Sequence, residues 1–293
     1  MKKLRYVILL AAMVLLAALT ACDGEFVSNR EISIVSREEG SGTRGAFVEM
    51  LGIEVTDELG TRDLTSPYGE VANGTNMVIT AVSGNYYAIG YISLGTLNDS
   101  VRAISIDGVA ATAENVLNGS YPLFRAFEIA IREDISALAQ DFIDFILSAQ
   151  GQSVVTQKGY VVVDADAEEY TASENEGTIV VIGSTSVAPL MERLIEAYEA
   201  LNPGVTVQMQ INGSSAGITA VINGTADIGM TSRPLRDTEA AQADSIHIAY
   251  DGLVVITHND NPLENLSQDE VRRIFIGDIT LWDYFIRPQE EFN

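Results

Sequence analysis

Cysteine, histidine and tryptophan are scarce in this chain of 293 residues, which has one cysteine, two histidines and one tryptophan. A single thiol excludes an intramolecular disulfide and a metal site built from several cysteines. The histidines, His247 and His258, lie in or after apolar runs and not beside a serine-rich loop. A catalytic serine needs a neighbouring base, and no Gly-Lys-Ser/Thr nucleotide-binding signature is present, so the sequence argues against an enzyme and against a bound cofactor or metal.

Basic residues are also few, with 17 Lys and Arg against 41 Asp and Glu, which gives a formal net charge of −24. This charge repels nucleic acid and gains nothing from anionic lipid, so neither is expected to bind. It repels phosphate at long range as well, so a site for an anion has to act through local dipoles at short range. The simplest interpretation of the charge is solubility outside the cell.

The apolar run near the N-terminus, Tyr6–Leu19, is shorter than the about 20 residues that a membrane-spanning helix needs. It follows the basic segment Met1–Arg5 and precedes Leu19-Thr-Ala-Cys22. This order is typical of a bacterial lipoprotein signal peptide. We therefore predict a signal peptide over residues 1–21, a lipidated Cys22 that anchors the chain at the extracytoplasmic face of the cell membrane, and a tether over residues 22–30.

Three short segments combine an apolar run, a knot of Gly, Ser and Thr, and a helix-like run. The knots are Gly183-Ser-Thr-Ser186, Asn212–Gly217 and Glu39–Gly45. The first N–H groups of a helix have no internal partner and carry partial positive charge, so a helix start is a ready anion site. Small residues let an anion approach the backbone, and hydroxyls add donors. Three such loops predict a tetrahedral oxyanion held from several sides.

Strands that alternate with helices predict an α/β protein with largely parallel sheets. Examples are a helix over Val187–Leu201, stopped by Asn202-Pro203-Gly204, and an alternating strand over Val205–Ile211. Residues 59–72 contain Gly, Pro, Ser and charges and are predicted to form a surface loop. The acidic segment 164–177 lacks the glycine and the distal glutamate of a calcium loop, so it is interpreted as a solvated linker.

Four motifs carry a family resemblance: Gly183-Ser-Thr-Ser-Val-Ala-Pro-Leu190, Gly213-Ser-Ser-Ala-Gly217, Ala226-Asp-Ile-Gly-Met-Thr-Ser-Arg233 and Ser36-Arg-Glu-Glu-Gly-Ser-Gly-Thr-Arg-Gly45. Together they resemble the phosphate-binding lipoproteins that feed ABC importers. The resemblance implies an α/β, two-lobed periplasmic-binding-protein fold of type II that closes over its ligand. It further implies a monomer that delivers inorganic phosphate to the permease subunits of an importer, without catalysis. A phosphate sensor without a transport role remains an alternative.

The order of the segments differs from that family, in which the part similar to Ile179–Trp282 comes first and the part similar to Ile32–Val163 comes second. We therefore predict a circular permutant in which the acidic linker joins what are normally the two ends. Such a rearrangement is plausible because domain termini often lie close together at the surface. A fusion of two half-proteins is the alternative.

Carried onto this order, the family fold predicts where the two lobes begin and end. One lobe consists of residues 31–106 plus 263–293, and the other of residues 107–262, which include the linker. Asp251–Thr257 and a segment near Phe127–Arg132 are the candidates for the hinge.

The candidate ligands come from the three loops and from the residue before one of them. The phosphate-binding residues expected on one lobe are Arg37, Ser41, Gly42 and Thr43, and those on the other are Thr185, Ser186, Ser214 and Ser232. The resemblance assigns Arg37 as the cationic ligand, because a guanidinium binds two oxyanion oxygens in parallel. A salt bridge of Arg37 to Glu38 or Glu39 is the structural alternative, and Arg44 is expected to point away.

Ser232 stands where better-known members of the family have an aspartate that accepts the proton of hydrogen phosphate. A hydroxyl accepts or donates, so discrimination against sulfate has a weaker basis here. Asp227 and Glu39 are alternative acceptors, although Asp227 is equally suited to cap a turn. Binding of another tetrahedral oxyanion, such as sulfate or molybdate, therefore stays open.

Overall fold

The computed structural model describes residues 26–57, 60–172 and 175–286. The predicted signal peptide, the lipidation site Cys22 and the start of the tether lie outside these residues. Within the described part of the chain, no helix combines the length and the apolar character needed to cross a bilayer.

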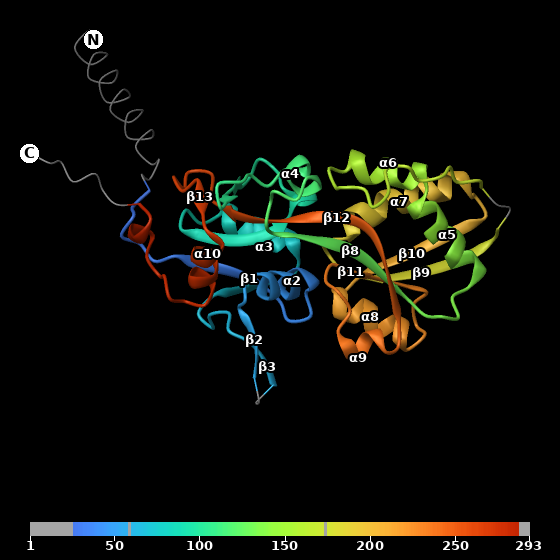
Figure 1. The fold of residues 1–293 in the computed structure, drawn as a ribbon, viewed down its shortest axis with the longest axis horizontal. Helices are drawn as coiled ribbons and strands as arrows, with labels where there is room; N and C mark the ends of the chain where they lie inside the picture. Colours follow the sequence, from blue (N-terminus) through green and yellow to red (C-terminus); the bar gives the residue numbers. More distant parts are fainter. Residues whose placement is uncertain (1–25, 58–59, 173–174, 287–293) are drawn as a thin grey trace, which may run out of the picture.

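Two groups of elements lie at the two ends of an elongated molecule (Figure 1). The first group, at the left of Figure 1, surrounds the described N-terminus and contains β1 (Ser33–Arg37), α2 (Gly42–Met50), β2 (Glu54–Asp57), β3 (Gly60–Asp63), β4 (Glu70–Ala72), α3 (Thr75–Ser83), β5 (Ala88–Ser93), η1 (Leu94–Thr96), β6 (Arg102–Ala103), β7 (Ser105–Ile106), α4 (Ala113–Leu117), β13 (Asn265–Leu266), α10 (Gln268–Phe275) and η2 (Trp282–Tyr284). The second contains α5 (Ala137–Leu147), α6 (Ala149–Gln157), β9 (Gly177–Gly183), α7 (Ala188–Leu201), β10 (Val205–Ile211), α8 (Ser214–Ile222), β11 (Ile228–Thr231) and α9 (Asp237–Ala240).

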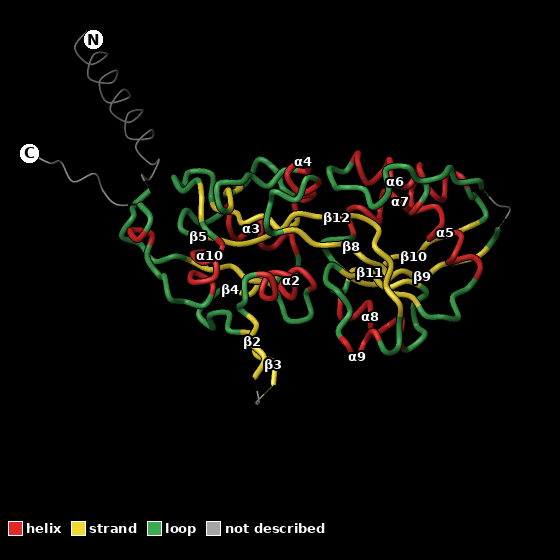
Figure 2. The backbone as a smooth tube through the Cα atoms, viewed as in Figure 1, coloured by secondary structure: helices red, strands yellow, loops and turns green. Residues whose placement is uncertain are grey.

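Two long strands, β8 (Phe124–Ile131) and β12 (Asp244–Thr257), run between the groups (Figure 2). The sheet order is β10-β9-β11-β8-β12-β5-β1-β4, with β6 also paired to β12. The outer strands β10, β9 and β11 are parallel, as are β5, β1 and β4, whereas β8 and β12 pair antiparallel with each other and with their neighbours. The sequence predicts a largely parallel sheet. The observed sheet is mixed, because the two long strands at its centre are antiparallel to their neighbours.

The buried apolar residues form separate cores around the two ends of these strands, and we call the parts of the molecule at these ends the first and second lobe. The first-lobe core includes Phe47 stacked on Tyr91, with ring centroids 3.8 Å apart, and the fully buried Trp282. The second-lobe core is built around Phe142, Phe145 and Tyr198. Separate cores allow the lobes to move as units. Residues 107–123 contribute Val116, Tyr121 and Leu123 to the first core.

Several predicted elements agree closely with the structure, and two do not. Helix α7 and strand β10 match their predicted bounds within one residue. The predicted surface loop 59–72 contains β3 and β4, because β4 pairs in parallel with β1 and covers its edge. The segment Gly159–Val163, whose run of valines is typical of a strand, forms an isolated bridge instead, between Val161 and Tyr250.

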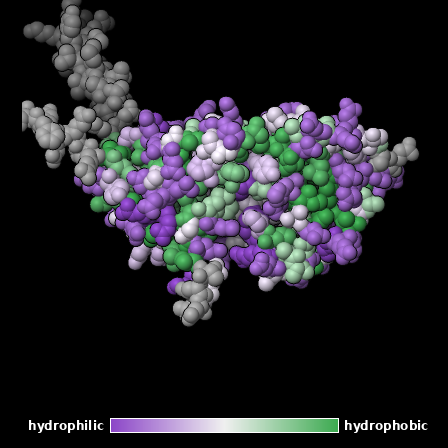
Figure 3. All heavy atoms as spheres, viewed as in Figure 1, coloured by the Kyte–Doolittle hydropathy of each residue, from purple (hydrophilic) through white to green (hydrophobic). Residues whose placement is uncertain are grey.

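The predicted acidic linker is tied to the second lobe by Tyr170. Its hydroxyl donates to Asp141 Oδ2 at 2.8 Å, and its ring meets Phe145 edge-on. The face in Figure 3 mixes hydrophilic and apolar areas over both lobes.

Candidate functional site

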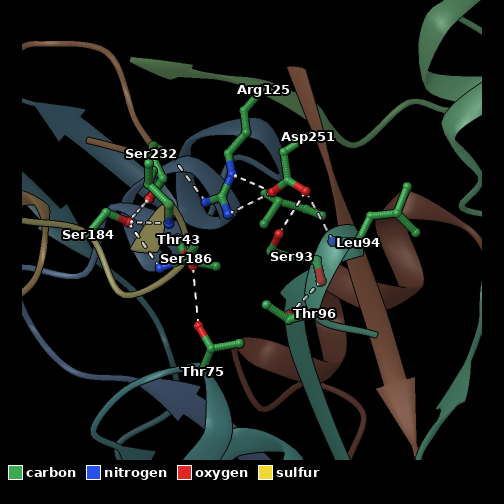
Figure 4. A network of polar contacts seen from close by, with 12 residues as sticks. Thr43, Thr75, Ser93, Leu94, Thr96, Arg125, Ser184, Ser186, Ser232 and Asp251 are labelled. Atoms are coloured by element: carbon green, nitrogen blue, oxygen red, sulfur yellow. Dashed lines mark hydrogen bonds and ion pairs between the residues drawn. The ribbon is translucent and has the colours of Figure 1, made fainter. Parts of the chain in front are cut away.

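Four helix N-termini, two from each lobe, meet between the lobes. They belong to α2 and α3 of the first lobe and to α7 and α8 of the second. Buried hydroxyls join them, namely Thr43, Thr75, Ser184, Ser186, Ser214 and Ser232 (Figure 4). The predicted convergence of the three Gly/Ser/Thr loops is therefore present in the structure, and a fourth helix start takes part.

Two pairs of hydroxyl oxygens from opposite lobes lie within hydrogen-bonding distance. Thr43 Oγ1 lies 2.6 Å from Ser186 Oγ, and Thr75 Oγ1 lies 3.3 Å from the same oxygen. Within the second lobe, Ser232 Oγ lies 3.0 Å from Ser184 Oγ and 3.4 Å from Ser214 Oγ. The lobes are thus closed on each other around a set of neutral donors.

Helix α2 begins at Gly42, inside the predicted Glu39–Gly45 loop. Ser41 caps it by accepting the Arg44 N–H at 3.3 Å, which leaves the Ser41 proton available to donate. Gly42 lies against the second lobe, because a Cβ there would overlap Ser214 Oγ and lie 2.6 Å from Ser232 Oγ. Gly42 and Thr43 therefore lie on the face of α2 that meets the second lobe, and Ser41 directly precedes them.

The second-lobe wall depends on two glycines with positive φ. Gly183 has φ 150°, and a Cβ there would collide with the Met230 carbonyl, so the loop after β9 requires glycine. Gly213 has φ 93° and starts α8 at Ser214, inside the predicted loop. The Ser232 N–H donates to Ser214 Oγ at 3.2 Å. Because Ser214 Oγ accepts this bond, its own proton is available to another acceptor.

Arg37 is almost fully buried, forms the salt bridge given above as the structural alternative, and also reaches hydroxyls between the lobes. Its Nε and Nη2 each donate to the Glu38 carboxylate at 2.7 Å, so the salt bridge is present. Its Nη2 also donates to Thr185 Oγ1 at 2.8 Å, and its Nη1 to Thr75 Oγ1 at 3.4 Å, which places the outer edge of the guanidinium at the hydroxyl cluster. Arg44 turns away, as predicted, towards Asp63.

The Glu38 carboxylate also accepts the Gly74 N–H at the start of α3, at 3.1 Å. Burial alone raises the pKa of Glu38, but the hydrogen bonds and charge of Arg37 outweigh burial and hold the pKa below its ordinary value of 4.5. An ionised Glu38 therefore stabilises the folded protein above that value, and the contribution is lost as pH falls through the lower folded-state pKa.

We expect Glu38→Gln to lower the unfolding temperature near neutral pH, with a difference from the parent chain that shrinks as the solution is acidified. The reason is that acid removes the same charge from the parent chain. Thermal unfolding over a series of pH values measures this, with Glu39→Gln, an exposed neighbour, as the control. A difference that stays constant into strong acid would contradict the role given to the ionised carboxylate.

The two alternative acceptors lie away from the hydroxyl cluster. Asp227 Oδ2 accepts the Val180 N–H at 2.8 Å and stands before β11, whereas Ser232 follows its other end. Glu39 is exposed. Asp227 therefore acts as a backbone cap, the simpler of its two interpretations.

The sequence reasoning missed Thr75, Ser184 and a buried ion pair. Thr75 follows Gly74, whose φ of 96° repeats the Gly213 arrangement, so Gly-Thr before a helix was the available signal. The ion pair joins Arg125 of β8 to Asp251 of β12, with Nε and Nη2 3.2 and 3.0 Å from Oδ2. Burial raises the pKa of Asp251 and lowers that of Arg125, so each charge depends on the other.

The arrangement offers donors for an oxyanion and no catalytic base. Gly213–Gly217 has the spacing Gly-x-Ser-x-Gly, but its central Ser215 hydroxyl bonds Arg233 Nη2 at 3.2 Å. His247 pairs with Glu128 instead, and the His258 ring lies against that of Tyr86 at an angle of 46°. Among the described residues, no group of three or more His, Cys, Asp or Glu is placed to hold a metal ion.

A protein-family model matches most of this chain. The model of the PBP superfamily domain matches residues 21–150 and 168–292. Phosphate-binding protein PstS 2 of Streptococcus pneumoniae serotype 4 is 46% identical over 270 residues, which cover 90% of this chain and 93% of that protein. Phosphate-binding protein PstS of Bacillus subtilis is 32% identical over 139 residues, which cover 46% of this chain and 43% of that protein.

A solved structure agrees with this. The crystal structure of a phosphate ABC transporter, phosphate-binding protein from Streptococcus pneumoniae TIGR4, is 48% identical. It covers 87% of this chain and 100% of its own, with a TM-score of 0.72. The two-lobed α/β fold expected from the sequence is therefore confirmed.

Proposed function

We propose that this chain, which belongs to the PBP superfamily and is related over most of its length to phosphate-binding PstS proteins, captures inorganic phosphate between its lobes. We propose further that it delivers the phosphate to the permease subunits of an ABC importer. The observation that carries the proposal is the meeting of four helix N-termini, their hydroxyls and Arg37 between the lobes.

Each predicted ligand has a distinct role in this proposal. Arg37 presents the guanidinium edge that Glu38 leaves available, and Gly42 and Thr43 present the first N–H groups of α2. The proposed hydroxyl ligands are those of Ser41, Thr43, Thr185, Ser186, Ser214 and Ser232. Because these groups are neutral except Arg37, the site acts at short range despite the net charge of −24.

The two lobes supply ligands separately, so phosphate favours the closed arrangement by contacting both. We propose that β8 and β12 form the hinge, in keeping with the predicted segments Phe127–Arg132 and Asp251–Thr257. The predicted lobe limits at residues 106 and 262 stay predictions. The packing of residues 107–123 in the first core favours a division within the long strands instead.

We propose that the segment order is a circular permutation of the usual one. One observation supports this: the Bacillus subtilis protein matches over less than half of each chain, whereas PstS 2 of Streptococcus pneumoniae matches over 90% of this chain and so has the same segment order. An alignment that keeps the residue order of both chains can match only one of two exchanged segments. The protein would be a monomer. The lipid on Cys22 would then tether it to the outer face of the membrane through the first lobe.

Isothermal titration of the chain from Cys22 onward, first with phosphate and then with sulfate, tests the function. We expect micromolar or tighter phosphate binding, on the order of 8 kcal/mol or more, and weaker sulfate binding. Equal affinities would remove phosphate from the proposal and favour a general binder of tetrahedral oxyanions, which the neutral Ser232 makes the second candidate.

The same titrations on Ser232→Asp show how the hydroxyl at this position sets selectivity. A carboxylate accepts the proton of hydrogen phosphate but meets only lone pairs on sulfate. We therefore expect the ratio of phosphate to sulfate affinity to rise at least about tenfold, mostly through lost sulfate binding. An unchanged ratio would mean that Ser232 does not face the anion.

A further inference from the structure

The buried ion pair Arg125–Asp251 lies where β12 changes its partner. Asp251 pairs with Arg125 on β8, whereas Leu253, two residues on, pairs with Ser93 on β5. Both charged side chains are at most 1% exposed. The pair therefore sits at the crossing between the lobes and not at the surface.

Arg125 reaches from this crossing to the hydroxyl cluster. Two of its nitrogens bind Asp251, and its third, Nη1, donates to the Ser232 main-chain carbonyl at 3.1 Å (Figure 4). The Ser232 N–H is held by Ser214 Oγ. With carbonyl and N–H both fixed, the hydroxyl is the part of Ser232 that remains to contact a ligand.

Asp251 in turn is held by the first lobe. Its Oδ1 accepts the Ser93 hydroxyl at 2.8 Å and the Leu94 N–H at 3.1 Å. A chain of charge-assisted bonds thus runs from the first lobe through Asp251 and Arg125 to Ser232 in the second.

We propose that Arg125 is a positioning residue for the anion site, that it orients Ser232 through the main-chain carbonyl, and that Asp251 holds Arg125 in place. This inference rests on the proposed function, because it gives Ser232 the role of a phosphate ligand. A lysine cannot reproduce the role, since it lacks the planar fork that bonds a carboxylate and a carbonyl at once.

The strand itself offers a matched control. Arg132, just beyond the other end of β8, donates Nε to Asp134 and Nη1 to the Val221 carbonyl, at 2.7 and 3.0 Å. It therefore makes the same pair of bonds, to an aspartate and to a second-lobe carbonyl, away from the hydroxyl cluster. Arg132→Lys therefore removes bonds of the same kind but leaves the position of Ser232 unchanged.

The experiment is a double-mutant cycle with phosphate titrations of Arg125→Lys, Ser232→Ala and the double variant, alongside Arg132→Lys. We expect Arg125→Lys to weaken binding about tenfold in the parent chain and less than about twofold in the Ser232→Ala background, because the effect passes through that hydroxyl. Arg132→Lys is expected to change affinity less than about twofold.

Thermal unfolding without phosphate shows whether each variant folds. If Arg125→Lys does not, Arg125→Gln with Asp251→Asn replaces it in the cycle, since this pair leaves no buried charge alone. Independent, additive losses, or an equal loss in Arg132→Lys, would overturn the positioning role while phosphate binding stands. A parent chain that binds no phosphate would overturn the proposed function and this inference with it.

Discussion

Gly42→Ala is expected to weaken phosphate binding by about 10- to 100-fold and to leave the ligand-free protein folded. The added Cβ would overlap Ser214 Oγ and lie 2.9 Å from Ser214 Cβ, so the two lobes could not close to the same distance. Overpacking of this kind costs about 1–3 kcal/mol, and here the cost falls on the closed state alone. Alanine also favours a helix over glycine by about 1 kcal/mol, so α2 itself is not weakened.

Gly45→Ala is the matched control on the same helix. Its Cβ would lie 3.0 Å from Arg233 Cδ, so this neighbour has to shift by only a few tenths of an ångström, whereas the Cβ at Gly42 would overlap Ser214 Oγ. Phosphate titration and thermal unfolding of both variants separate closure from folding. Equal losses of affinity in the two variants would show that Gly42 has no special place at the site.

The sequence was sufficient to predict the kinds of elements and the loops that meet, but not how the loops contact each other. Helix α7 and strand β10 were predictable because apolar periodicity and a Pro-Gly stop are local signals. The starts of α2 and α8 were placed too late, because Gly, Ser and Thr are typical of loops. In the structure, the Ser41 cap and the positive φ of Gly213 put them in a first helical turn.

The contacts across the lobes lie beyond any local pattern. Thr43 and Ser186 are 143 residues apart in the sequence, and Arg125 and Asp251 are 126 apart. Each charged residue of that pair lies in an apolar, strand-like stretch, where a lone charge has no visible partner. Only the sheet register, with Asp251 opposite Arg125, brings them together.

Ser214→Asp is expected to reduce phosphate affinity by about 1000-fold. Ser214 is fully buried, and its hydroxyl lies 3.4 Å from that of Ser232, so a carboxylate there would face the anion. Two unit charges about 4 Å apart repel by about 4 kcal/mol at an effective dielectric constant of about 20, which is about three decades in Kd. Aspartate is favourable in the first turn of a helix, which offsets part of the cost of burying its charge, and thermal unfolding without phosphate shows whether the variant folds.

Ser215→Asp adds the same charge one residue further along α8 and is the control for Ser214→Asp. Ser215 is half-buried and its hydroxyl accepts from Arg233 Nη2, so a carboxylate there would share this guanidinium with Glu239. We expect a loss at least about tenfold smaller than for Ser214→Asp, measured by titration of both variants, because a paired charge repels the anion less. Micromolar affinity retained by Ser214→Asp would place the start of α8 away from the ligand. The site would then depend on α2, α3 and α7 alone.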